Sequence, residues 1–151
     1  MTSKINILFV IFASAVIIAS CTKNESKVSS TNSSESHNMG KNCMECHKSG
    51  GKGEGWFTTA GTVYNSNLSS TNPNGFIELY TKANGAGTLV KRIAIDGLGN
   101  FYTTETINFS AGLYPVVVSS TGNKMYMGSS ITTGACASCH GSSQDKIWVS
   151  N

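Results

Sequence analysis

The chain has 151 residues, of which 11 are Lys or Arg, 8 are Asp or Glu and 3 are His, so its formal net charge is +3 at neutral pH. The basic residues do not gather into a stripe, and this argues against a nucleic-acid partner. The length suits one folded domain with short additional segments at its ends.

The N-terminus has the pattern of a secretory signal peptide. Lys4 is the only charged residue before an apolar run that ends at Ile18, and two small residues follow before Cys21. The run is shorter than the about 20 apolar residues that a membrane-spanning helix needs. Residues 1–20 therefore predict a signal peptide, and a retained membrane anchor is the alternative. The stretch Ile18 to Cys21 resembles the bacterial lipobox, which implies that Cys21 is lipidated and begins the mature protein. A plain secretory signal without lipidation is the alternative to this resemblance.

Residues 21–36 predict a flexible tether behind that lipid. From Thr22 to Ser36 the chain consists of Ser, Thr, Asn, Lys and Glu with one apolar residue, Val28. This composition cannot bury enough apolar surface to fold. The lipobox resemblance thus implies a protein anchored to the membrane and not spanning it. Because Thr22 is not the Asp that retains some lipoproteins in the inner membrane, the resemblance favours the outer membrane, with the domain facing the periplasm or the cell surface.

Residues 37–151 are expected to form one domain in three parts, 37–55, 56–131 and 132–151. The first and last parts each contain a pentad of the same pattern, Cys43-Met44-Glu45-Cys46-His47 and Cys136-Ala137-Ser138-Cys139-His140. Cys-x-x-Cys-His is the attachment signature of c-type haem. Two thiols at this spacing reach the vinyl groups on one porphyrin edge, and the next residue presents an imidazole to the iron. The pentads predict two c-type haems, bound covalently through Cys43, Cys46, Cys136 and Cys139 and ligated axially by His47 and His140.

Other chemistries use the same cysteine spacing. Four thiolates can bind zinc, and the same thiols can form disulfides or a redox-active pair. Neither alternative needs a histidine directly after the second cysteine, and both pairs here have one. The repeated histidine favours haem, with zinc or disulfide staples as the alternative.

The second axial ligand of each iron decides between a carrier and an enzyme. His37 is the one remaining histidine, and its position six residues before Cys43 allows it to fold back over the first haem. For the other iron the candidates are Met125 and Met127, which alternation places on one face of a strand, where a methionine commonly fills a core instead. An iron without a sixth ligand would bind small molecules. Each proximal histidine also needs a partner for its other ring nitrogen.

The central part, residues 56–131, predicts a β-sandwich or small barrel. Short runs of β-branched and aromatic residues alternate with turns rich in Gly, Asn, Pro and Asp, and no long stretch has helical periodicity. The candidate strands are residues 57–64, 76–81, 89–95, 101–104, 105–109, 113–120 and 124–129. Trp56 and Phe57 are candidates either to pack on the first haem or to join the core.

The order of turns and strands resembles a known fold family. Gly61-Thr62-Val63-Tyr64, Phe76 to Tyr80, Asp96 to Phe101 and Ala111 to Val118 together resemble the carboxypeptidase-regulatory-like, transthyretin-type β-sandwich. With the two pentads added, the domain is similar to small bacterial dihaem cytochrome c lipoproteins. The resemblance implies an all-β, Ig-like or transthyretin-like sandwich bracketed by two short haem-binding segments, with one haem at each end of the sandwich.

These features predict electron transfer by a lipid-anchored dihaem cytochrome that exchanges electrons with redox partner proteins of the cell envelope. The chain offers no clustered pair of carboxylates for acid–base catalysis, so an electron carrier is favoured over an enzyme. A haem enzyme of peroxidase-like activity, or a sensor of small ligands with an open iron, is the first alternative. A β-sandwich binding module with zinc or disulfide staples is the second.

Overall fold

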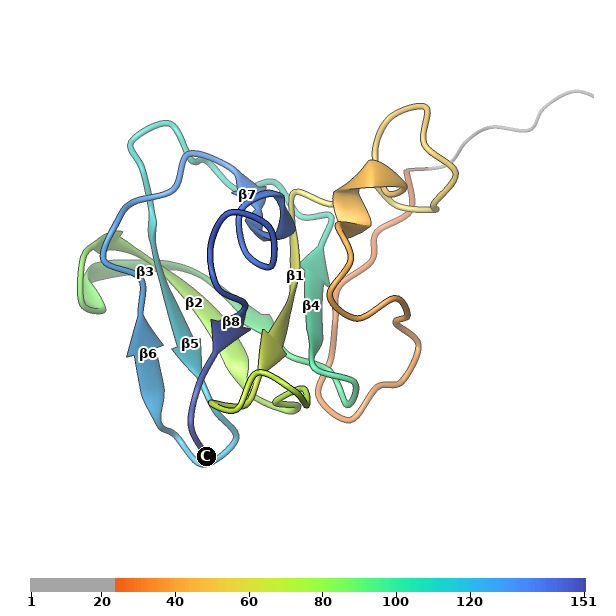
Figure 1. Ribbon diagram of the computed structural model, residues 1–151. Helices are drawn as coiled ribbons and strands as arrows, with labels where there is room; N and C mark the ends of the chain where they lie inside the picture. Colours follow the sequence, from red (N-terminus) through yellow and green to blue (C-terminus); the bar gives the residue numbers. More distant parts are fainter. Residues whose placement is uncertain (1–23) are drawn as a thin grey trace, which may run out of the picture.

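The computed structural model describes residues 24–151 and shows a β-rich domain (Figure 1). The expected signal peptide and Cys21 lie outside the described residues. None of the helical segments within residues 24–151 is long or apolar enough to cross a membrane. In chain order the elements are η1 (Cys43–Glu45), β1 (Thr59–Tyr64), β2 (Phe76–Lys82), β3 (Ala86–Ala94), β4 (Asn100–Thr103), β5 (Tyr114–Val118), β6 (Lys124–Tyr126), β7 (Gly134–Ala135), η2 (Cys136–Ser138) and β8 (Ile147–Trp148).

The strands form two sheets packed face to face, as expected for an all-β sandwich (Figure 1). One sheet has the order β3-β2-β5-β6, and every neighbouring pair in it is antiparallel. In the other sheet, β4 pairs with β1 antiparallel, whereas the short strands β7 and β8 pair with β1 in parallel. Strand β1 is therefore the central strand of the second sheet.

The two sheets enclose one hydrophobic core. Each strand turns alternate side chains inward, as Ile77 and Leu79 do from β2, because successive side chains of a strand point to opposite faces. Burial of these side chains stabilises the sandwich by about 25 cal/mol for each Å² of apolar surface removed from water. The cluster consists of Val63, Ile77, Leu79, Ile93, Ile95, Phe101, Leu113, Val117 and Val149.

All but one of the predicted strands are present, with ends that differ by a few residues. Residues 105–109 form no strand, although their apolar residues alternate with polar ones. Ile107 and Phe109 instead pack against the core from an irregular segment. The alternation of apolar and polar residues therefore reflects burial of every second side chain, although the segment pairs with no neighbouring strand. The strands β7 and β8 were not expected, because a strand of two residues has no detectable periodicity.

The segment expected to be a flexible tether differs from that prediction over its described part. Val28 forms an isolated bridge with Thr103 of β4. The Ser29 side chain is buried, and its hydroxyl donates to the carbonyl of Ala94 over 2.6 Å while its amide donates to the carbonyl of Tyr102 over 3.0 Å. The prediction of a flexible tether considered only how little apolar surface the segment can bury. The segment is instead held by hydrogen bonds to β4 at the edge of the sheet.

Candidate functional site

The two pentads, called here the first motif (43–47) and the second motif (136–140), fold into the same turn. In the first motif the amides of Cys46 and His47 both donate to the carbonyl of Cys43, over 3.2 and 3.0 Å. The corresponding amides of the second motif reach the carbonyl of Cys136 over the same distances. Residues three and four apart lie on one face of such a turn, so each motif presents its two thiols and its imidazole on the same side.

Both motif histidines have the same kind of partner. Nδ1 of His47 lies 2.8 Å from the carbonyl oxygen of Glu54, and Nδ1 of His140 lies 2.6 Å from that of Asp145. A carbonyl oxygen only accepts, so Nδ1 carries a proton, and in the neutral imidazole the lone pair is then on Nε2, the nitrogen that can bind a metal. The expected partner for the second ring nitrogen is confirmed. Its identity was not foreseen, because a backbone carbonyl leaves no side-chain signal in a sequence.

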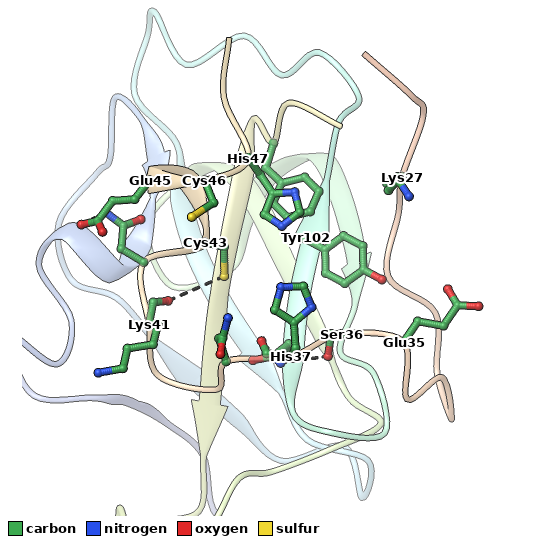
Figure 2. Close-up of a pocket in the computed structure, with 14 residues that line it drawn as sticks. Lys27, Glu35, Ser36, His37, Lys41, Cys43, Glu45, Cys46, His47 and Tyr102 are labelled. Carbon is green, nitrogen blue, oxygen red and sulfur yellow. Dashed lines mark hydrogen bonds between the residues drawn. The ribbon is translucent and has the colours of Figure 1, made fainter. Parts of the chain in front are cut away.

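The first motif borders a cavity of about 340 Å³ that also receives His37. Figure 2 shows the rings of His37 and His47 turned toward each other, with the sulfur atoms of Cys43 and Cys46 on one side of the gap between them. The ring centroids are 6.0 Å apart. A metal–imidazole bond is about 2 Å long and a ring nitrogen lies about 1 Å from its ring centre, so two imidazoles on opposite sides of one metal have centres about 6 Å apart. The observed spacing fits such a pair.

The ring of His47 is fixed by its neighbours. Phe57 stacks on it with centroids 4.2 Å apart and planes 10° apart, and Tyr102 stacks on Phe57 in turn at 4.9 Å. On another side, a Cβ at Gly53 would lie 2.7 Å from His47 Nδ1, so only glycine leaves room for the ring. Phe57 is buried, as one of its two interpretations has it, and it contacts the motif histidine, while its packing on a haem stays a prediction.

The second motif lies in a loop between two short strands on β1. Before the loop, Gly134 of β7 is opposite Thr59, and after it Ile147 of β8 is opposite Val63. Cys136 packs against the hydrophobic core, and its Cβ lies 3.3 Å from the position that a Cβ on Gly61 would take. The chain has 3 histidines, and the other two face each other at the first motif, so no histidine remains for a second axial position at His140.

The methionines proposed for that position lie on and just after β6. Met125 is half-buried and packs against the hydrophobic core, and Met127 is half-buried as well. Tyr126 between them is 43% exposed, so both methionines are less exposed than the residue that separates them. Met125 thus fills the core, as one of the two interpretations has it. A ligand role for Met125 or Met127 stays a prediction.

The two motifs contact the same strand, which differs from the expectation that their segments lie at opposite ends of the sandwich. The turns η1 and η2 both contact β1. The first motif shortly precedes β1 in the chain, and the second lies between β7 and β8, which both pair with β1. This pairing joins residues far apart in the chain, so the local sequence pattern does not reveal it. Both candidate centres therefore lie along one strand.

Burial changes the chemistry of one cysteine in each motif. It raises the pKa of the Cys136 thiol to about 12, with smaller contributions from the charges of Cys139 and Cys43, and it also raises the pKa of Cys43. Such thiols are poor nucleophiles at neutral pH, because a nucleophilic cysteine must be a thiolate.

All four motif cysteines are free thiols. Within residues 24–151, no three His, Cys, Asp or Glu side chains gather into a group that could hold a metal ion. The single cluster that a four-thiolate zinc site would need is thus not formed by the described residues.

The chain matches no protein-family model, and comparisons with curated proteins and with solved structures found no match either. What the two motifs can do is therefore inferred from their own residues and geometry.

Proposed function

We propose that this protein transfers electrons as a dihaem c-type cytochrome of the bacterial cell envelope, tethered to the membrane through a lipid on Cys21. The observation that supports this proposal best is the pair of imidazoles at the first motif. His37 and His47 face each other at 6.0 Å between ring centroids, beside two thiols on one turn. This is the donor set and the spacing that a covalently attached haem with two axial histidines needs.

The residues of the first motif suit a haem in several respects. The bond of His47 Nδ1 to a carbonyl selects the neutral tautomer whose lone pair is on Nε2, as a metal ligand needs. Cys43 and Cys46 lie on the same side of the cavity, so both could be joined to one porphyrin edge. A haem held between His37 and His47 would supply one-electron redox chemistry that needs no bound substrate. The protein's contribution is to fix both rings, so that little rearrangement accompanies the change of charge.

The second motif supports a second haem by the same local geometry. Its turn and its histidine–carbonyl contact repeat those of the first motif. Because both turns contact β1, two attached haems would be neighbours, and an electron could pass from one to the other inside the domain. Redox partner proteins of the envelope would deliver and remove the electron.

A second candidate function applies to the second motif alone. Since the chain has three histidines and two pairs would need a fourth, an iron bound by His140 could keep an open position for a small ligand, as in a sensor or a peroxidase-like enzyme. Ligation by Met127, Met125 or another side chain would remove that position. The number of carbon monoxide molecules bound per reduced chain separates the two candidates.

The experiment is to express the full precursor in a bacterium that attaches c-type haem, and to purify the protein from its envelope. We expect two c-type haems per chain by pyridine haemochrome, and a reversible redox titration with one electron per haem. The matched control is the variant in which Cys43, Cys46, Cys136 and Cys139 are all replaced by alanine, which should be exported without colour. A colourless native protein, or haem that cannot be reduced and reoxidised reversibly, would contradict the proposal.

A further inference from the structure

His37 is exposed, so its own packing does not explain why its ring faces His47. The histidine lies in a loop, called here the distal loop (36–40), that crosses the outside of β1. Asn38 and Gly40 have positive φ angles of 54° and 78°, so the loop is tightly curved. Exposed loops of this kind are mobile unless something ties them to the sheet.

A pair of buried polar side chains provides that tie. The hydroxyl of Thr62 accepts a hydrogen bond from the amide of Gly40 over 2.9 Å and donates to Oδ1 of Asn100 over 2.6 Å. Nδ2 of Asn100 donates to the hydroxyl of Ser36 over 2.8 Å and reaches the carbonyl of His37 over 3.5 Å. The two ends of the distal loop are thus bonded to one pair of side chains, with His37 between them.

The pair lies in the paired and buried part of the sheet. Thr62 of β1 and Asn100 of β4 are register partners, and they are 6% and 2% exposed. The backbone amide of Asn100 donates to Oδ1 of Asp96 over 2.9 Å, which fixes the residue in the chain. Hydrogen bonds are strong where water is excluded, and a buried partner that loses its bond pays the full desolvation penalty. Tyr64 also restricts the loop: a Cβ on Gly40 would lie 2.4 Å from its hydroxyl oxygen, so the loop packs closely against Tyr64 at this position.

We propose that Thr62 and Asn100 are positioning residues that hold His37 in place as the distal ligand of the first haem. This inference rests on the proposed function, because it assigns a role toward that haem. The pair holds the ring at its working distance before any haem is attached. A preorganised ligand binds with a smaller loss of conformational freedom, so the six-coordinate state is favoured over one with a free distal side.

The test compares two threonines on the same strand. Thr62→Val removes the hydroxyl that links the loop to Asn100, while Thr59→Val removes a buried hydroxyl that has no hydrogen-bond partner. We expect Thr62→Val to keep two haems per chain but to lose part of the low-spin signal of one haem and to bind additional carbon monoxide, up to one molecule per chain above the wild type. Thr59→Val should match the wild type, and Thr62→Ser should restore the low-spin signal.

A second measurement uses the protein without haem. In the variant with four alanines in place of the motif cysteines, the Gly40 amide that donates to Thr62 should exchange slowly, and Asn100→Ala should accelerate its exchange severalfold while the amide of Val63 stays protected. This readout remains informative if Thr62→Val folds poorly.

The outcomes separate this inference from the proposed function. A haem count below two in the wild type overturns the function itself. Two haems together with an unchanged spin state and carbon monoxide capacity in Thr62→Val, and unchanged loop exchange in Asn100→Ala, overturn only the positioning role. An equal loss of low-spin signal in Thr62→Val and Thr59→Val would also overturn it, because the effect would then come from general destabilisation.

Discussion

The first and second motifs share one turn but have different surroundings. Both bond the histidine amide to the first cysteine's carbonyl over 3.0 Å and the histidine Nδ1 to a carbonyl further along the chain. The first motif borders a cavity, and its histidine faces His37. The second motif contacts β1, and its Cys136 packs against the hydrophobic core. The comparison teaches that the five residues of a motif determine the turn and the orientation of its own histidine. What faces that histidine, such as His37 at the first motif, depends on the rest of the fold.

The difference has a functional consequence if both motifs carry haem. An iron with two imidazoles sits at lower potential than one with imidazole and thioether, so different distal ligands would give the two haems different potentials. An open second iron would instead add ligand binding to electron transfer. The following experiments alter one motif at a time.

The largest effect is expected from removing the thiols of one motif. Replacing Cys43 and Cys46 by alanine, or Cys136 and Cys139 by alanine, should each halve the haem content, measured by pyridine haemochrome. The second pair of replacements should also lower the free energy of unfolding by about 1 kcal/mol more than the first, because Cys136 packs against the core. Equal stability of the two double variants would argue against a structural difference between the motifs.

The next effect is the loss of one axial ligand. His37→Ala should leave two haems attached but convert one of them to a high-spin iron that binds carbon monoxide when reduced, as seen by absorption and electron paramagnetic resonance spectra. Met39→Leu is the matched control, since Met39 lies in the same loop and is 47% exposed. A His37→Ala protein with the wild-type spectrum would exclude His37 as a ligand.

What the sequence could predict follows the range of the interactions. The Cys-x-x-Cys-His pattern and the strand alternation are local, so the motifs and most strands could be foreseen. The contact of His47 with the Glu54 carbonyl and the docking of Ser29 on β4 use backbone groups, which every residue has. The meeting of both motifs at β1 depends on pairing between residues far apart in the chain, and so does the bond between Thr62 and Asn100.

The third effect concerns thiol reactivity in protein made without haem. Because burial raises the pKa of Cys136 from 9.0 to about 12, its thiolate fraction at pH 8 should be about a thousandfold below that of an ordinary thiol. Iodoacetamide followed by peptide mass spectrometry should therefore label the exposed Cys139 first. The labelling rate of Cys136 should keep rising with pH up to about its pKa, while rapid labelling at pH 7 would contradict its burial.

The smallest effect is expected from a methyl group beside one imidazole. Gly53→Ala places a Cβ 2.7 Å from His47 Nδ1, so the ring must shift and its bond to the Glu54 carbonyl weakens. We expect the midpoint potential of one haem to change and that of the other to stay. Gly128→Ala is the control, because a Cβ there meets nothing within 4 Å. If the two variants titrate identically, the carbonyl contact does not tune the first haem.

The most direct test of the account is the intact mass of the envelope-purified protein, followed by mass spectrometry of its peptides. The account predicts the mass of two added haems, one on the peptide that contains Cys43 and Cys46 and one on the peptide that contains Cys136 and Cys139. A chain of unmodified polypeptide mass at both peptides would contradict it.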